Sequence, residues 1–472
     1  MPRLLTSSLA LLLGLAAAFG GGSPGVSAAG AAESGKGGQG GERVPRAEGL
    51  LEVYRQARDA DPQLRGRRAE LAALRADRRE ALGALLPGVS ASANVSRIER
   101  DQLRSTFTGD QDITREYTQQ QYRVNLTQPL LDLPAWHRWQ GQDRRADAGE
   151  ADLEARRQGL IHDVAKAYLE VLGARSRVTL KQRELEQVRA QRERVAALRE
   201  AGEASASELQ EVRARFDRVR AELLRARGEV EIAREGLTAL TDERHERLAG
   251  LRPGAELPAL EPRDPQRWVE HAVTGNPKVV AARQRVAAEG RQARAARAER
   301  YPQVNLTGGF TRYDDFDGTR FGREIEDWSV GVQVRMPLYE GGAMRARASS
   351  AEHRQARQAQ ELERARRQAR QDVRSAYEGL LSGRSEIEAF RLAVRSAERS
   401  LEAIRAEVEA GTRPIADLLE AQRKRFEARH SLTEARHQYL LDTLALRRAA
   451  GHLSAEDVRA LDALFSPGGR HS

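Results

Sequence analysis

Two pairs of carboxylates occupy matching places in this sequence and are its strongest candidates for chemistry. Asp417 and Glu420 are three residues apart, and Glu208 and Glu211 stand 209 positions earlier with the same spacing. Side chains three apart lie on one face of a helix, so each pair would present two negative charges together. Acidic groups gathered around an opening attract cations. The alternative is an ordinary solvated helix face.

The residue patterns that catalysis requires are not found in the sequence. The nine histidines show no metal-binding spacing such as HExxH, and there is neither a Gly-rich phosphate loop nor a nucleophile elbow. Because the chain has no cysteine, disulfides and thiolate metal sites are excluded. We therefore expect no enzyme activity, no metal and no cofactor.

The charge of the chain does not indicate nucleic-acid binding. The net charge is +9, but Lys and Arg are interspersed with Asp and Glu instead of forming one basic face. Aromatic residues make up 5% of the chain and charged residues 31%, which leaves little apolar material for several compact cores. We therefore predict a mainly α-helical protein built from elongated helices, with a smaller β part.

The first 31 residues have the pattern of a secretory signal peptide. Arg3 precedes an apolar stretch at Leu4–Phe19 and then small residues, so cleavage fits best after Ala28 or Ala31. A flexible Gly-rich leader follows at 32–45, and no cysteine is available for a lipid anchor. No later stretch approaches the roughly 20 apolar residues of a membrane-spanning helix. We therefore expect insertion through β-strands, in an outer membrane.

The chain is internally duplicated. The segment Leu85–Arg97 returns as Arg300–Arg312 with its proline and its last arginine in register, and Pro129 similarly matches Pro337. A period of roughly two hundred residues is far longer than a solenoid repeat and indicates two half-molecules. We assign the first repeat, a Pro-rich connector, the second repeat and a C-terminal tail to residues 46–250, 251–265, 266–465 and 466–472.

Each repeat is predicted to contain two β-strands. Apolar Val304, Leu306 and Phe310 alternate with polar neighbours, and this period of two gives a strand one apolar and one polar face. Such faces suit a membrane barrel with lipid outside and water inside. The predicted strands cover about 88–106, 115–129, 303–313 and 324–337, and the loops Thr106–Glu116 and Tyr313–Glu324 are expected outside the cell.

Long helices are predicted after the strands. Val164, Val171, Val178 and Leu185 are spaced by seven, and sustained heptads produce left-handed supercoiling. A helix over about 134–201 would be on the order of 100 Å long. Helices of this length predict a coiled-coil body.

The heptads of both repeats are interrupted at matching places. The interruptions fall at about 200–207 and 409–416, and each contains a glycine suited to a helix C-terminus, Gly202 and Gly411. A new helix can start directly after each glycine. We therefore predict two helical hairpins whose tips lie at the same end of the molecule.

Four strands per chain cannot close a barrel around a lumen. Unpaired backbone groups in lipid cost several kcal/mol each, and a water-filled pore needs roughly a dozen strands. Three chains of four strands are the smallest arrangement that works. We therefore predict a homotrimer that forms a 12-stranded β-barrel in outer-membrane lipid, continued by a periplasmic α-helical barrel.

The chain resembles the TolC family of trimeric outer-membrane efflux and secretion channels over nearly its whole mature length. The most specific segment is AGTRPIADLLEAQRKRFEARHSLTEARHQYLLDTLALRRAAGHLSAEDVRAL at Ala410–Leu461, supported by the strand openings LLPGVSASA and YPQVNLTGG and the strand endings QPLLD and MPLYEGG. The resemblance implies the exit duct of a tripartite machine for efflux or type I protein secretion. Its partners would be a periplasmic adaptor and an ABC or proton-driven inner-membrane pump.

The resemblance also implies roles for residues near the tips. The positions of Asp417 and Glu420 would face the lumen as acidic rings at the periplasmic constriction, and Arg413 would latch the closed tip. Its expected partner is Glu208 or Ser207 in the first repeat. These residues would form a periplasmic gate.

The turns themselves would dock the adaptor. The docking residues implied by the resemblance are Gly202, Gly411 and Thr412, although all could simply end their helices. Pro414 follows Arg413 where a non-proline is usual, which leaves the adaptor unidentified. An alternative function for the same heptads is an exported coiled-coil tether or spacer of the envelope, without channel activity.

Overall fold

The computed structural model describes residues 47–466 with the exception of 108, 253 and 317–322. The predicted signal peptide, the Gly-rich leader, part of the predicted loop Tyr313–Glu324 and nearly all of the tail lie outside the described residues.

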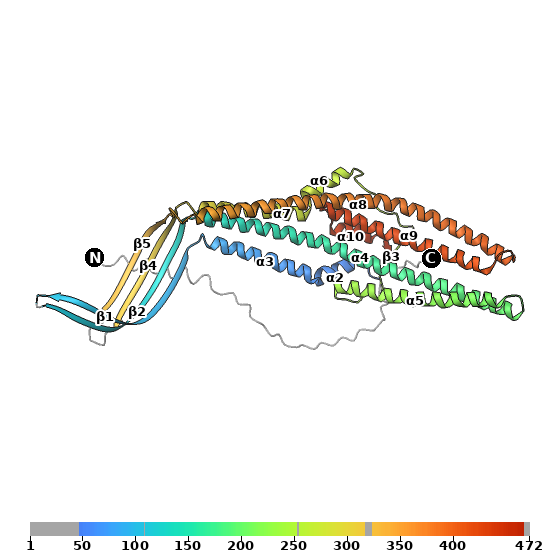
Figure 1. The fold of residues 1–472 in the computed structure, drawn as a ribbon, viewed down its shortest axis with the longest axis horizontal. Coiled ribbons are helices and arrows are strands. Elements are labelled where there is room, and N and C mark those ends of the chain that lie inside the picture. Colours follow the sequence, from blue (N-terminus) through green and yellow to red (C-terminus); the bar gives the residue numbers. More distant parts are fainter. Residues whose placement is uncertain (1–46, 108, 253, 317–322, 467–472) are drawn as a thin grey trace, which may run out of the picture. The chain divides into compact units, whose positions relative to one another are not determined.

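The first repeat consists of two short helices, a strand pair and a long helical hairpin (Figure 1). Its elements are α2 (Leu50–Ala60), α3 (Pro62–Gly83), β1 (Gly88–Thr106), β2 (Gly109–Leu131), α4 (Leu133–Glu200) and α5 (Ala206–Thr241).

The second repeat has the same order of elements. They are α6 (Pro265–Gly275), α7 (Pro277–Ala298), β4 (Gln303–Phe316), β5 (Arg323–Arg335), α8 (Ala343–Glu409) and α9 (Ile415–Ala450), with β3 (Gly250–Leu251) before them and α10 (Ala455–Asp462) and β6 (Phe465–Ser466) after them. The matching order confirms the predicted internal duplication and the mainly helical fold with a β part.

In both repeats, the second helix starts with a side-chain cap followed by a proline. The Asp61 carboxylate accepts the N–H of Leu64 at 3.0 Å, and Pro62 occupies the first turn of α3. In the second repeat, Asn276 caps α7 through its side-chain oxygen, and Pro277 takes the first helical position. A proline is tolerated there because the first backbone N–H groups of a helix have no intrahelical partner.

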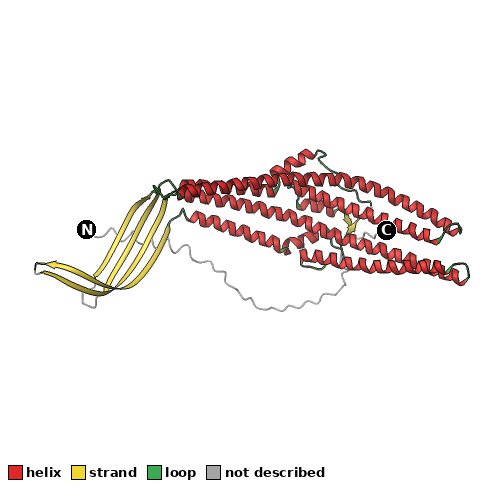
Figure 2. Ribbon diagram, in the orientation of Figure 1, coloured by secondary structure: helices red, strands yellow, loops and turns green. Residues whose placement is uncertain are grey.

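The four long strands form one antiparallel sheet in the order β1-β2-β4-β5 (Figure 2). The two repeats meet at the centre of the sheet, where β2 pairs with β4 and Val124 faces Phe310 across the register. The outer strands β1 and β5 form the two edges of this sheet. The sheet therefore joins the repeats but leaves an edge on each side.

The first strand pair is longer than the sequence predicts. β2 begins at Gly109, and the β1–β2 ladder runs without a break from Thr106↔Gly109 to Gly88↔Thr127. The predicted loop Thr106–Glu116 is therefore wrong, because most of it is strand. These polar residues show no clear alternation, but hydrogen bonding to β1 extends the pair, and Gly109 adopts the positive φ of 117° needed at a tight turn.

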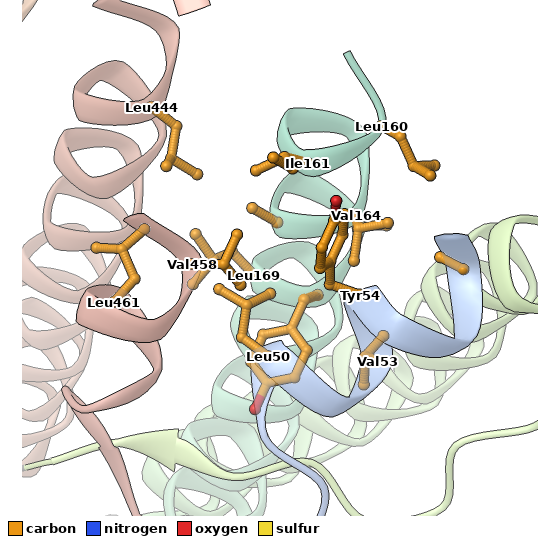
Figure 3. Packing of buried hydrophobic residues seen from close by; sticks show 14 of the residues in the cluster. Leu50, Val53, Tyr54, Leu160, Ile161, Val164, Leu169, Leu444, Val458 and Leu461 are labelled. Carbon is orange, nitrogen blue, oxygen red and sulfur yellow. The ribbon is translucent and has the colours of Figure 1, made fainter. Parts of the chain in front are cut away.

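A buried apolar cluster lies halfway along α4. Leu50, Val53 and Tyr54 of α2 pack towards Ile161 and Val164 of α4, and residues of α9 and α10 complete the cluster (Figure 3). Of the predicted heptad residues, Val164 and Val171 are fully buried, whereas Val178 and Leu185 are partly exposed.

Both described ends of the chain are attached near this cluster. The two-residue strands β3 and β6 pair with each other, and the N–H of Leu51 donates to Asp462. The buried Tyr168 hydroxyl donates to the carbonyl of Ala249 at 2.7 Å, and the carbonyl of Glu48 lies 3.1 Å from the same hydroxyl oxygen. These contacts fasten segments far apart in sequence to the middle of α4.

Among the described residues, no helix is both long and apolar enough to cross a membrane.

Candidate functional site at the hairpin tips

The turn of the first tip, between α4 and α5, is built around Gly202. Its φ is 81°, and its N–H donates to the carbonyl of Arg199 at 3.0 Å. The next N–H, from Glu203, reaches back to Leu198 at 2.8 Å. This pair of bonds satisfies the last carbonyls of α4, and it requires a left-handed residue that glycine provides without a steric penalty.

The turn of the second tip, between α8 and α9, repeats this geometry. Gly411 has a φ of 75° and donates to Val408 at 3.1 Å, while the N–H of Thr412 donates to Glu407 at 3.0 Å. The Thr412 hydroxyl donates to the same Glu407 carbonyl at 2.9 Å. The glycines predicted at the tips therefore have the expected conformation, and Thr412 closes the second turn.

The first tip restarts its helix with a capping box. Ser205 Oγ accepts the N–H of Glu208 at 3.1 Å, and Glu208 Oε2 accepts the N–H of Ser205 at 2.7 Å. The Ser207 hydroxyl is 2.9 Å from Ser205 Oγ. Hydrogen bonds from the backbone and hydroxyl of Ser205 lower the pKa of Glu208. Glu208 and Ser207 are thus engaged within their own tip, while Glu211 is exposed.

The second tip restarts its helix without a side-chain cap. Pro414 occupies the N-cap position, and Arg413 forms ion pairs on both sides of the turn. Arg413 Nε is 2.6 Å from Glu407 Oε2 at the end of α8, and its Nη1 is 3.6 Å from Asp417 Oδ2 at the start of α9. Among the described residues, Arg413 forms ion pairs with these two carboxylates and not with Glu208, the predicted partner.

The second acidic residue, Glu420, lies one turn further along α9. It binds Arg423 through two contacts of 2.5 and 2.9 Å, and Lys424 Nζ is 3.8 Å away. The hydrogen bonds from Arg423 lower the pKa of Glu420. The Asp417 and Glu420 side chains are each 46% exposed, so the predicted acidic pair is accessible but paired with arginines.

The start of α9 also rests on the first hairpin. Leu419 is buried in one cluster with Val195 of α4 and Leu209 and Val212 of α5, and Ile415 packs against the same cluster. This contact was not predicted from the sequence. Apolar residues at 415, 418 and 419 follow the i, i+3, i+4 pattern of a packed helix face, which was the available signal. The second tip is therefore anchored on the first within one chain.

No group of three or more His, Asp or Glu side chains in the described part of the chain is arranged to hold a metal ion. The site consists of two glycine turns, one arginine between two carboxylates, and an accessible acidic pair. Such an arrangement can bind cations or hold two helices together through charge, and it offers no group positioned for covalent chemistry.

Comparison with known proteins identifies the family. A family model described as outer membrane efflux protein matches residues 53–242 and 268–452. The chain belongs to the outer membrane efflux protein family. This efflux protein is 30% identical to outer membrane protein TolC of Vibrio cholerae, over 88% of its own length and 94% of that relative.

A second relative and a solved structure agree. The efflux protein is 28% identical to the alkaline protease secretion protein AprF of Pseudomonas aeruginosa, over 89% of this chain and 88% of that one. It superposes on the crystal structure of a membrane protein from Pseudomonas aeruginosa with a TM-score of 0.74 and 25% identity, covering 87% of this chain and 92% of that one.

Membership in the family gives the location and the general function. The efflux protein is an outer-membrane exit duct of efflux and type I secretion systems. The family consists of transport ducts and not of enzymes, and its channels work with adaptor proteins and inner-membrane pumps. The envelope tether considered from the heptads alone does not fit this family.

Proposed function

We propose that three copies of this efflux protein form one duct that is gated at the hairpin tips. The observation that carries the gate is the position of Arg413, which pairs with Glu407 and Asp417 across the second turn while α9 rests on the first hairpin through Leu419. The charged turn and the anchored helix start together hold the second tip in one position.

The edges of the sheet support the trimer. β1 and β5 have no further strand beyond them in the described chain, and unpaired edges are costly in lipid. Three chains would pair β5 of one copy with β1 of the next, giving twelve strands. Alternate residues of β5 form an exposed apolar face suited to lipid: Trp328, Val330, Val332 and Val334.

In the trimer, Asp417 and Glu420 would form two acidic rings at the periplasmic end. Rings of carboxylates favour cations and bind divalent ions more tightly than monovalent ones because the charges add. Arg413 and Arg423 partly balance these rings in each chain. The duct would therefore conduct cations preferentially, and divalent cations would block it.

The adaptor would dock on the two glycine turns. Gly202, Gly411 and Thr412 lie at the ends of the hairpins, and no Cβ added at either glycine would meet another atom within 4 Å. The turns are thus accessible to a partner. The inner-membrane pump, of the ABC or proton-driven class, would select the cargo.

The test is single-channel conductance of the mature protein in planar bilayers. Asp417→Ala with Glu420→Ala is expected to raise conductance and weaken divalent-cation block. A matched control is Asp77→Ala with Glu80→Ala, an exposed pair of the same residues at the same spacing on α3. Equal behaviour of the two double variants would remove Asp417 and Glu420 from the gate, and a protein without conductance would overturn the duct itself.

A further inference from the structure

Arg177 connects both helical hairpins at a level well away from the tips. It lies on α4, where its Nη1 is 2.5 Å from Glu229 Oε2 of α5 and its Nη2 is 2.9 Å from Glu434 Oε1 of α9. One contact stays within the first hairpin, and the other reaches the second. One arginine therefore holds three helices.

The connection lies about 35 Å from the end of α4, at 1.5 Å per helical residue. Between it and the tip, α9 contacts the first hairpin again through the buried Leu419. The tip-proximal part of α9 is therefore held at two points, by apolar packing at its start and by the Arg177–Glu434 ion pair further along.

An open groove between the hairpins leaves this ion pair as an important contact between them. A groove of about 860 Å³ opens beside Arg177, with walls from α4, α5, α8 and α9. Ile232 on its wall is 75% exposed, so continuous apolar packing does not fill this level. The charged contact consequently spans a region in which side-chain packing between the hairpins is incomplete.

The ion pair has a titratable neighbour. His430 Nε2 on α9 is 3.1 Å from Glu434 Oε1, while its buried Nδ1 has no hydrogen-bond partner among the described residues. Burial lowers the pKa of His430, and the positive charges of Arg177 and Lys181 act in the same direction against the carboxylates. The charged groups that act on His430 are Arg177 and Lys181 from α4, Glu229 from α5 and Glu434 from α9.

We propose that Arg177 is a positioning residue of the gate, which fixes α9 against the first hairpin through Glu434 and thereby keeps the tips closed. This inference rests on the proposed function. Protonation of His430 adds a positive charge beside Arg177 and competes for Glu434, so acid weakens the connection. The tip residues and Arg177 then hold the same helix, α9, at two positions along its length.

The experiment compares the two contacts of the same arginine. Glu434→Gln removes the contact between the hairpins, and Glu229→Gln removes the contact within the first hairpin. Glu434→Gln is expected to raise open probability in planar bilayers about fivefold, the size expected for the loss of three partly exposed ion pairs. Glu229→Gln should leave open probability unchanged, although both variants lower the melting temperature by similar amounts. Arg177→Glu alone would place a carboxylate against Glu229. In the Glu229→Gln background, exchange of the charges by Arg177→Glu with Glu434→Arg should therefore restore the closed duct.

The outcomes separate the two proposals. If the wild type conducts and Asp417→Ala with Glu420→Ala responds as expected, equal open probabilities of Glu434→Gln and Glu229→Gln overturn the role of Arg177 alone. Failure of the charge exchange to restore closure overturns it as well. A wild type that does not conduct overturns the proposed duct and this inference together.

Discussion

The two hairpin tips have the same turn but are fixed by different interactions. Both turns contain a left-handed glycine and the same pair of backbone hydrogen bonds. The first tip then closes with the capping box of Ser205 and Glu208, whereas the second has Pro414 without a cap and depends on the ion pairs of Arg413. The hydrogen bond that the Ser205 hydroxyl accepts joins two neutral groups, whereas exposed ion pairs are screened by salt. We therefore expect salt to change the stability of the second tip more than that of the first.

The largest effect is expected from removing the contact between the tips. Leu419→Ala would delete a buried side chain that is 7% exposed and should cost about 2 kcal/mol of local stability. Amide hydrogen exchange at the start of α9 measures this cost. Leu381→Ala, at a leucine of α8 that is 44% exposed, is the control and should change exchange little. Equal exchange in both variants would mean that the tips are independent.

The next effect concerns the first tip alone. Ser205→Ala removes the cap of α5 and should cost about 1 kcal/mol, seen as faster exchange in the first turn of α5 and not in α9. The change should be the same at low and high salt. Ser396→Ala, at an exposed serine inside α8, controls for the loss of a hydroxyl. If the effect of Ser205→Ala on exchange depended strongly on salt, the two tips would not differ in the kind of interaction that fixes them.

Arg413→Gln tests the second tip and should have a smaller effect. Loss of two exposed ion pairs costs about 0–1 kcal/mol each, and the difference from wild type should vanish at roughly 1 M salt, where the Debye length is about 3 Å. The two measurements are amide hydrogen exchange around Thr412 and the open probability of the channel. Arg405→Gln, which breaks an exposed pair with Glu409 within α8, should not affect the gate. An Arg413 effect that persists at high salt would indicate a role other than charge pairing.

The smallest effect is a pH dependence of the second hairpin. Because burial lowers the pKa of His430 in the folded protein, the unfolded chain takes up a proton first, near its ordinary pKa of about 6.5. The contribution of this group is therefore complete above that pH and is lost as pH falls towards the folded pKa. Melting temperatures between pH 7.5 and 5 should fall less in His430→Gln than in wild type. If the melting temperatures of wild type and His430→Gln fall in parallel with pH, His430 is not the source of the pH dependence.

Sequence patterns were sufficient to predict the duplication, the heptads and both glycine turns. The heptads and the turns depend on residues close together in the sequence, such as Gly202 after a run of heptads, and the duplication is visible when the two halves are aligned with each other. The length of β2 could not be predicted in the same way, because residues 109–116 become strand through hydrogen bonds with β1, and backbone hydrogen bonding does not depend on alternation of side chains.

The ion pairs of the site were harder to predict than its position. Arg413 has several carboxylates within a few turns, and sequence alone does not distinguish Glu407 from Glu208. Arg177 was missed because it stands in a helix in which charged residues are frequent. Its importance depends on Glu434, which is 257 residues away and meets it only after α9 folds against α4.

The pairing of β3 with β6 beside the middle of α4 has a practical consequence. Residues 47–51 and 462–466 are fastened at the same level, far from the hairpin tips and from the sheet. A purification tag or a fluorescent protein joined after residue 466 would be attached at this level, away from the sheet and from the tips proposed to carry the gate and to dock the adaptor. We expect such a fusion to leave bilayer recordings and adaptor titrations unchanged.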